Sequence, residues 1–273
     1  MAPVNYFIGL NPFQWIALLV ALLTLLILAD AWAGHYRRNF IHRVQYAPFL
    51  SGGLLVITAI MAIIEPRSHS IERALSAAGW LAIVVGLAGF CFHHYYGITR
   101  KPGGYKQLLN SLMYGAPPLA PLALTAVGAF ALIAERGLIG NGDIAGFPIR
   151  TALLAVIVVC LFGAILQAGI LHFRGAFNNP LMYAPLTIPV LTALAGIWMM
   201  AEPSPSVLIA LIFLFWLTLL TGFVGLGMHL RGLDRQMAGL YVPLFNWLQG
   251  PPPFAPALFV GLSAIGLVTT SLL

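Results

Sequence analysis

Long apolar runs recur along the whole chain and constrain its fold more than any other feature. A helix that crosses a bilayer needs about 17 to 25 predominantly apolar residues, and runs of this length follow one another with short interruptions. Charged residues make up 7% of the 273 residues, against about 25% in soluble domains. The sequence therefore predicts an all-α integral membrane protein without a separate water-soluble catalytic domain.

Hydropathy, interrupted by Pro, Gly and charged residues, predicts about eight transmembrane helices joined by very short loops. The predicted spans are residues 13–34, 46–64, 74–95, 113–133, 150–172, 183–200, 207–229 and 254–272.

Basic residues are distributed unevenly between the loops. Those after the first, third, fifth and seventh spans contain nine of the 13 Lys and Arg residues. Because basic loops are retained in the cytoplasm, this pattern predicts a bacterial inner-membrane protein with both termini outside. The uneven distribution of basic residues between the loops accounts for the net charge of +6. No nucleic-acid partner is therefore predicted. Six of the seven histidines lie near the predicted cytoplasmic face: His35, His42, His93, His94, His172 and His229.

Part of the sequence occurs twice. GHYRRNFIHRVQYAP (34–48) and LHFRGAFNNPLMYAP (171–185) share His, Arg, Phe, Tyr and Pro in one register, so that one constant shift along the chain superposes His35 on His172. Later in the chain a slightly shorter shift superposes His94 on the second-half residue His229. The stretch NSLMYGAPPLAP then faces NWLQGPPPFAP, which is one residue shorter.

These matches predict two tandem four-helix repeats, residues 1–140 and 141–273. The Gly-rich stretch 136–147 is the predicted linker between them. Because each repeat has an even number of spans, both enter the membrane from the same side. The pseudo-twofold axis is therefore expected to run along the membrane normal.

Histidines near the cytoplasmic ends of the odd-numbered spans form a candidate cofactor site. Imidazole is the commonest metal ligand, and helix bundles build cofactor sites from inward-facing side chains. An Arg follows three of these histidines by two residues and can pair with haem propionates. The candidate cofactor is haem b or a metal ion of unspecified identity. The candidate residues are His35, His94, His172, His229, Arg37, Arg174 and Arg231.

The same residues also fit structural and lipid-binding roles. His, Tyr and Arg at a helix C-terminus complement its dipole, cap its last carbonyls and lie among headgroups. Basic loops also attract anionic membrane lipids, at about 1 kcal/mol per residue, or an acidic partner subunit. The sequence leaves these alternatives open.

Asp30 is the one carboxylate inside a predicted span, and Gln167 is its equivalent under the shift that superposes His35 on His172. Acidic residues in a membrane are costly and indicate function by default. Asp30 precedes His35 by more than one helical turn, so the two side chains are not well stacked. A quinone-headgroup or proton-transfer role and interhelical hydrogen bonding, worth about 0.6 kcal/mol, both remain open.

The absence of several known sequence motifs reduces the number of functional classes that fit the chain. The chain contains no GxSxG, HExxH, P-loop or CxxC motif, and its spans show no polar midplane site of the kind that coupled transporters use. We therefore expect a membrane subunit of a larger, redox-type assembly, whose His/Arg ring holds a cofactor for electron transfer or docks a partner. A free-standing enzyme is less favoured. The alternative is a carrier or permease for an apolar or lipid-like substrate moving between the repeats.

Overall fold

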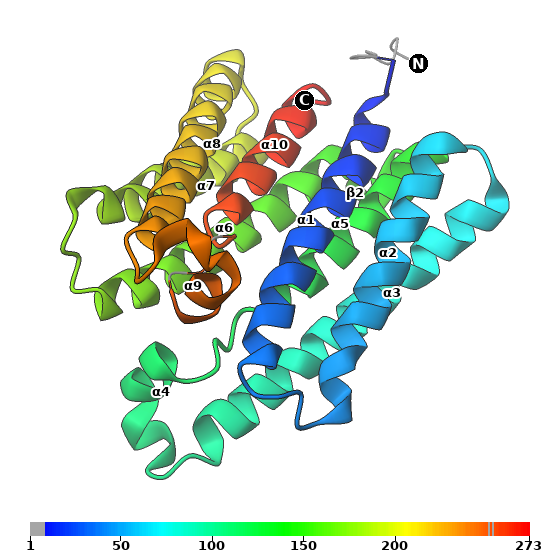
Figure 1. Cartoon of the computed structure of the whole chain (residues 1–273). Helices are drawn as coiled ribbons and strands as arrows, with labels where there is room; N and C mark the ends of the chain where they lie inside the picture. Colours follow the sequence, from blue (N-terminus) through cyan, green and yellow to red (C-terminus); the bar gives the residue numbers. More distant parts are fainter. Residues whose placement is uncertain (1–8, 251, 253) are drawn as a thin grey trace.

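The computed structural model describes residues 9–250, 252 and 254–273, and its regular structure is almost entirely helical (Figure 1). In this part of the chain, six helical segments are long and apolar enough to cross a membrane. The protein is therefore a multi-pass, all-α integral membrane protein. The six segments are built on α1 (Pro12–Tyr36), α2 (Ala47–Ile64), α3 (His69–His94), α6 (Ile149–Arg174), α7 (Ala184–Ala201) and α8 (Pro205–Asp234).

Two shorter apolar helices complete the bundle. α5 (Leu122–Leu138) has 17 residues and α10 (Ala257–Thr270) has 14. At 1.5 Å per residue they are about 25 and 21 Å long, less than the roughly 30 Å of a hydrocarbon core. Each follows a short separate helix, α4 (Leu108–Tyr114) or α9 (Pro243–Gln249).

The prediction of a continuous span over residues 113–133 is therefore wrong at its N-terminal end. The helix is broken between α4 and α5, where Pro117, Pro118 and Pro121 lack the N–H groups that a continuous helix requires. The predicted span 254–272 also differs, because helix α10 begins only at Ala257, after Pro256.

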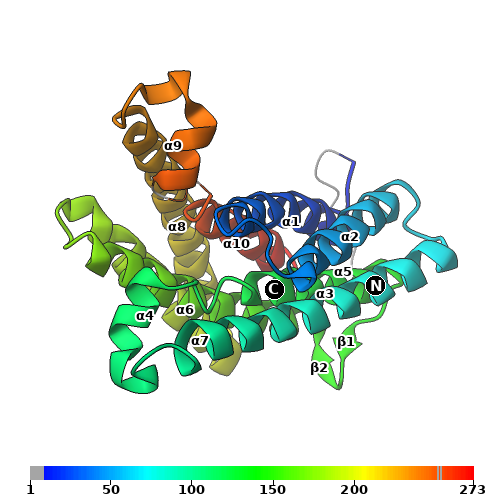
Figure 2. The same ribbon diagram turned by 60° about the horizontal axis from the view of Figure 1, so that its bottom comes forward.

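The centre of the molecule is formed by α1, α5, α6 and α10. α1 and α6 each pack against both α5 and α10. α2 and α3 flank α1 and α5, whereas α7 and α8 flank α6 and α10 (Figures 1 and 2). Buried side chains from the four central helices include Ile16, Phe130, Ile157 and Ile265.

The predicted Gly-rich linker contains a minimal β-hairpin. β1 (Asp143–Ile144) pairs antiparallel with β2 (Phe147–Pro148). The two residues between them, Ala145 and Gly146, have φ values of 53° and 83°. Two consecutive positive φ angles are typical of the tight turns that suit the twist of a hairpin.

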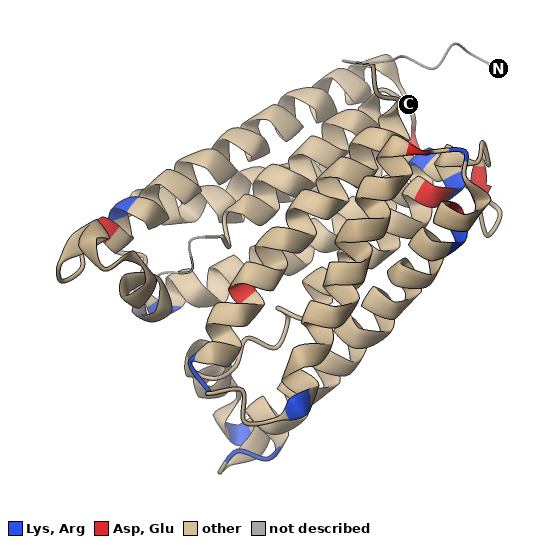
Figure 3. Ribbon diagram, turned by 45° about the vertical axis from the view of Figure 1, so that its right-hand side comes forward, with Lys and Arg blue, Asp and Glu red and all other residues tan. Residues whose placement is uncertain are grey.

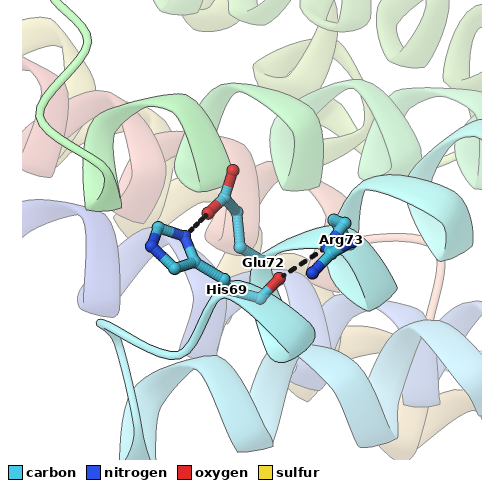
Figure 4. Close-up of polar contacts among 3 residues, drawn as sticks. All are labelled: His69, Glu72 and Arg73. Carbon is cyan, nitrogen blue, oxygen red and sulfur yellow. Dashed lines mark hydrogen bonds and ion pairs between the residues drawn. The ribbon is translucent and has the colours of Figure 1, made fainter.

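Charged residues gather toward the ends of the helices (Figure 3). At the first turn of α3, the ring Nδ1 of His69 lies 3.0 Å from Oε2 of Glu72, and Arg73 Nε donates to the His69 carbonyl oxygen at 3.3 Å (Figure 4). The His69 side chain is 87% exposed. This histidine therefore makes only local contacts, at the opposite end of α3 from His93.

Candidate functional site at the histidine-bearing helix ends

A tight turn follows α1. The Phe40 N–H donates to the His35 carbonyl oxygen at 3.2 Å, and Asn39 and Phe40 have φ values of 53° and 46°. A 3-10 turn, Arg43–Tyr46, then leads into α2. The rings of Phe40 and Tyr46 stack with their centres 4.8 Å apart and an angle of 16° between their planes. This stacking connects the beginning and the end of the turn.

The turn after α6 has the same local structure. The Phe177 N–H donates to the His172 carbonyl oxygen at 3.1 Å, and Ala176 and Phe177 have φ values of 54° and 48°. The rings of Phe177 and Tyr183 stack at 4.7 Å and 14°. The Phe and Tyr that the two stretches share are therefore turn residues, and both turns present a histidine at the helix end.

Two further histidines contact the chain breaks before α5 and α10. Nδ1 of His93 lies 2.9 Å from the carbonyl oxygen of Pro117, and Nδ1 of His229 lies 2.7 Å from that of Pro252. Because a carbonyl oxygen only accepts, each ring donates from a protonated Nδ1. Each carbonyl otherwise accepts only a long backbone bond of 3.4 Å, from Ala120 or Ala255, so the imidazole supplies its shorter hydrogen bond.

His93, rather than the predicted His94, therefore takes the place of His229. The neighbouring Nε2 of His94 makes a very short contact with the hydroxyl of Tyr105. Adjacent helical residues face about 100° apart, so only one member of the doublet reaches the break.

A π-helical turn, Tyr95–Thr99, explains this change of register. Two glycines that precede this level of the helices pack in the same way. A Cβ added at Gly86 would lie 2.8 Å from the carbonyl oxygen of Pro121, and a Cβ added at Gly222 would lie 3.0 Å from the carbonyl oxygen of Pro256. Along the sequence, Gly86 and Gly222 are one residue farther apart than Pro121 and Pro256. A π-bulge inserts one residue into a helix, often at a functional site. A shift that superposes Gly86 on Gly222 also superposes His93 on His229, so the sequence itself contains the signal for this alignment.

Two of the four histidines, His35 and His93, have their rings close together. The rings of His35 and His93 lie 6.3 Å apart, centre to centre, with an angle of 89°. The contact between His35 and His93 therefore connects the C-terminal ends of α1 and α3. His172 donates from Nδ1 to the Met182 carbonyl oxygen at 2.8 Å, and its charge influences that of His229.

The ring hydrogen bonds determine what these imidazoles can do. In a neutral ring that donates from Nδ1, Nε2 carries the free lone pair. Metal-binding histidines almost always donate their second ring N–H to a carbonyl or carboxylate, as His93, His172 and His229 do here. Within the residues that the structure describes, no group of three or more His, Cys, Asp or Glu side chains is placed to hold a metal ion.

The candidate arginines have separate contacts. Nη2 of Arg37 donates to the Trp247 carbonyl oxygen at 3.0 Å, and Nη1 of Arg174 donates to that of Met113 at 3.5 Å. Burial lowers the pKa of the Arg37 guanidinium, whereas Asp30 raises it and Arg174 lowers it. Arg231 is exposed in the last turn of α8 and has no side-chain partner among the described residues.

Asp30 and Gln167 are both half-buried. Asp30 interacts electrostatically with Arg37, which lies just beyond the C-terminal end of α1. The Oε1 atom of Gln167 is buried and has no hydrogen-bond partner in the described part of the chain. The structure does not connect the two residues, because α1 and α6 meet mainly through α5 and α10.

Two cavities lie away from the paired histidines. One of about 650 Å³ is lined by residues that include Asn11, Gln14, Glu65 and Arg67, at the end of the bundle where α1 begins. The other, of about 490 Å³, is lined by Asp234 and residues 238–241 beyond α8.

Comparisons of the chain with protein-family models, with curated proteins and with solved structures found no match. The fold and composition define the chain as a multi-pass integral membrane protein. Its function is therefore argued from the geometry of the histidine-bearing helix ends.

Proposed function

We propose that the chain is the membrane subunit of a larger electron-transfer assembly, and that its paired imidazoles hold haem or another redox metal group at the cytoplasmic face. The main support is the orientation of the rings. Nδ1 of His93, His172 and His229 is fixed on a backbone carbonyl. Nε2 of each ring is therefore left as the available ligand atom.

The separation within one pair also supports the proposal. Two imidazoles on one metal ion have ring centres at most about 6 Å apart, since each metal–nitrogen bond is about 2.0 Å. The rings of His35 and His93 are 6.3 Å apart. A ligand set of two histidines leaves the remaining metal positions to a macrocycle or to solvent.

We further propose that the chain contains eight spans in two tandem repeats, oriented in a bacterial inner membrane with both termini outside. The matching turns after α1 and α6, with the same backbone hydrogen bonds at equivalent positions, support the duplication. The broken helices α4–α5 and α9–α10 would serve as the fourth and eighth spans. Short loops favour partner subunits on the cytoplasmic face over independent catalysis.

The test is an absorption spectrum of the protein purified in mild detergent, oxidised and dithionite-reduced, with metal analysis of the same sample. We expect a Soret band that shifts on reduction and is lost in His93→Ala and in His229→Ala. His94→Ala and His69→Ala are matched controls that should keep it. A colourless, metal-free protein from haem-supplied cells would refute the cofactor.

A second candidate is a carrier for an apolar or lipid-like substrate moving between the repeats. The broken helices α4–α5 and α9–α10 favour it, because discontinuous helices commonly form transporter sites. The test is exchange of a fluorescent phospholipid between leaflets of proteoliposomes. Exchange no faster than in protein-free vesicles would reject this candidate for that substrate.

A further inference from the structure

The short helices α4 and α9 occupy equivalent places in the two halves. Each has seven residues and ends at a glycine, whose N–H donates to the carbonyl oxygen of the fourth residue of the helix. These bonds are 2.8 Å from Gly115 to Ser111 and 2.7 Å from Gly250 to Asn246. Ser111 in α4 is therefore the structural equivalent of Asn246 in α9, and both residues are buried.

These two equivalent residues anchor their helices differently. The Asn246 side-chain amide donates to the carbonyl oxygens of Met237 at 3.2 Å and Gly239 at 2.6 Å, in the segment that connects α8 to α9. Ser111 makes no side-chain hydrogen bond within the described part of the chain. A buried polar side chain therefore ties α9 to its own half, whereas α4 has no such anchor.

Both ends of the segment that contains α4 are attached to α3. His93 donates from Nδ1 to the Pro117 carbonyl oxygen at 2.9 Å, and Nε2 of His94 makes a very short contact with the Tyr105 hydroxyl. We call residues 105–117 the strap, because its two ends are attached to adjacent residues of one helix. Between these ends, α4 packs on the π-helical turn after α3 and on α6 of the opposite half.

Arg174, at the end of α6, supplies the polar contacts to the middle of the strap. Its Nη1 donates to the Met113 carbonyl oxygen at 3.5 Å, which is longer than a typical N–H···O bond. Its guanidinium carbon also lies 5.2 Å from the centre of the Tyr114 ring, and Tyr114 is 62% exposed. Because cation–π contacts at exposed sites are weak, the middle of the strap is held by two weak contacts to one residue of the other half.

We propose that the strap is a movable element, which Arg174 of the second half holds closed against the end of α3, and that α9 is its fixed counterpart. Release of Arg174 lets α4 move away from α6 while His93 and His94 keep both ends of the strap attached. The histidine-bearing end of the bundle then opens on one side only, beside the rings of His35 and His93. The proposal is independent of the redox function, because residues of this chain alone hold the strap.

The test is hydrogen–deuterium exchange of the full-length protein in mild detergent, followed by mass spectrometry of peptides that cover α4 and α9. We expect the amides of α4 to exchange faster than those of α9 in the wild type, since a segment with fewer and weaker contacts opens more often. Arg174→Gln removes the hydrogen bond to Met113 and the contact with Tyr114. This variant should speed exchange in α4 by about tenfold and leave exchange in α9 unchanged.

Two control variants separate release of the strap from a general effect of charge. Arg37→Gln removes the bond from Nη2 to the Trp247 carbonyl oxygen in α9, which is 3.0 Å long, but should leave exchange in α9 nearly unchanged because Asn246 remains. Arg100→Gln removes an exposed arginine next to the π-helical turn and should affect neither helix.

Three results would overturn the proposal. The first is equal exchange in α4 and α9 of the wild type, which decides the question even if Arg174→Gln does not fold. The second is unchanged exchange in α4 of a folded Arg174→Gln variant. The third is an acceleration of α9 by Arg37→Gln that is as large as that of α4 by Arg174→Gln, because α9 would then not be the fixed element.

Discussion

The His229 ring donates a hydrogen bond from Nδ1 to the carbonyl oxygen of Pro252, 2.7 Å away, and so ties α8 to the break before α10. Asn246 reinforces the same region, because its side-chain amide donates to the carbonyl oxygen of Met237 at 3.2 Å. Polar side chains therefore bind backbone carbonyls on both sides of α9, in segments where the helices are interrupted.

The first prediction concerns this bond. His229→Phe keeps an aromatic ring but leaves the Pro252 carbonyl with only the long hydrogen bond from the Ala255 N–H, at 3.4 Å, so it should lower the free energy of unfolding by about 1 kcal/mol. Thermal unfolding in detergent measures this. His69→Phe is the control, because its exposed contact with Glu72 is worth at most about 1 kcal/mol. Equal melting temperatures for the two variants would contradict the structural role of His229.

The second prediction concerns the packing of α3 on α5. A Cβ at Gly86 would lie 2.7 Å from the Thr125 nitrogen and 2.8 Å from the Pro121 carbonyl oxygen, and neither backbone atom can move cheaply. Gly86→Ala should destabilise the protein by about 1–3 kcal/mol. Gly34→Ala meets nothing within 4 Å and should be neutral or stabilising, because Ala favours a helix over Gly by about 1 kcal/mol. If the two variants had comparable thermal stability, α3 and α5 would be farther apart at Gly86 than in this structure.

The third prediction uses the left-handed residues of the two turns. Ala176 and Asn39 occupy equivalent positions with φ values of 54° and 53°, but Asn tolerates this conformation better than Ala. Ala176→Gly should therefore stabilise the protein by about 0.5–1 kcal/mol, after the greater freedom of Gly in the unfolded chain is counted. Asn39→Gly should gain less. Thermal unfolding that ranks the two variants in the opposite order would argue against this turn geometry.

The fourth prediction concerns the proposed topology. In a background with Cys91 and Cys160 replaced, Asn141→Cys should react with a membrane-impermeant maleimide in intact cells. Lys101→Cys should react only after permeabilisation, because it belongs to the basic loops assigned to the cytoplasm. The cysteine-free protein controls for background labelling. Labelling of Lys101→Cys in intact cells would show that the protein has the opposite orientation in the membrane.

The long apolar helices could be predicted from hydropathy, since a run of about 20 apolar residues has few alternatives to a membrane helix. The break between α4 and α5 could not, although Pro117, Pro118 and Pro121 mark it. Hydropathy averages over a window and does not register where backbone N–H groups are missing. The π-helical turn at Tyr95–Thr99 escapes prediction for a related reason, because one extra residue leaves the apolar pattern almost unchanged.

The sequence by itself determined that the chain crosses a membrane several times and that the stretches around His35 and His172 share one pattern, because both follow from composition and spacing along the chain. Only the tertiary structure decided that His93 rather than His94 contacts the Pro117 carbonyl, and that Arg37 and Arg174 exchange partners between the halves. These outcomes depend on helix rotation and on which carbonyls a break exposes. Neither the rotation of a helix nor the exposure of a carbonyl group follows from the distance between two residues along the chain.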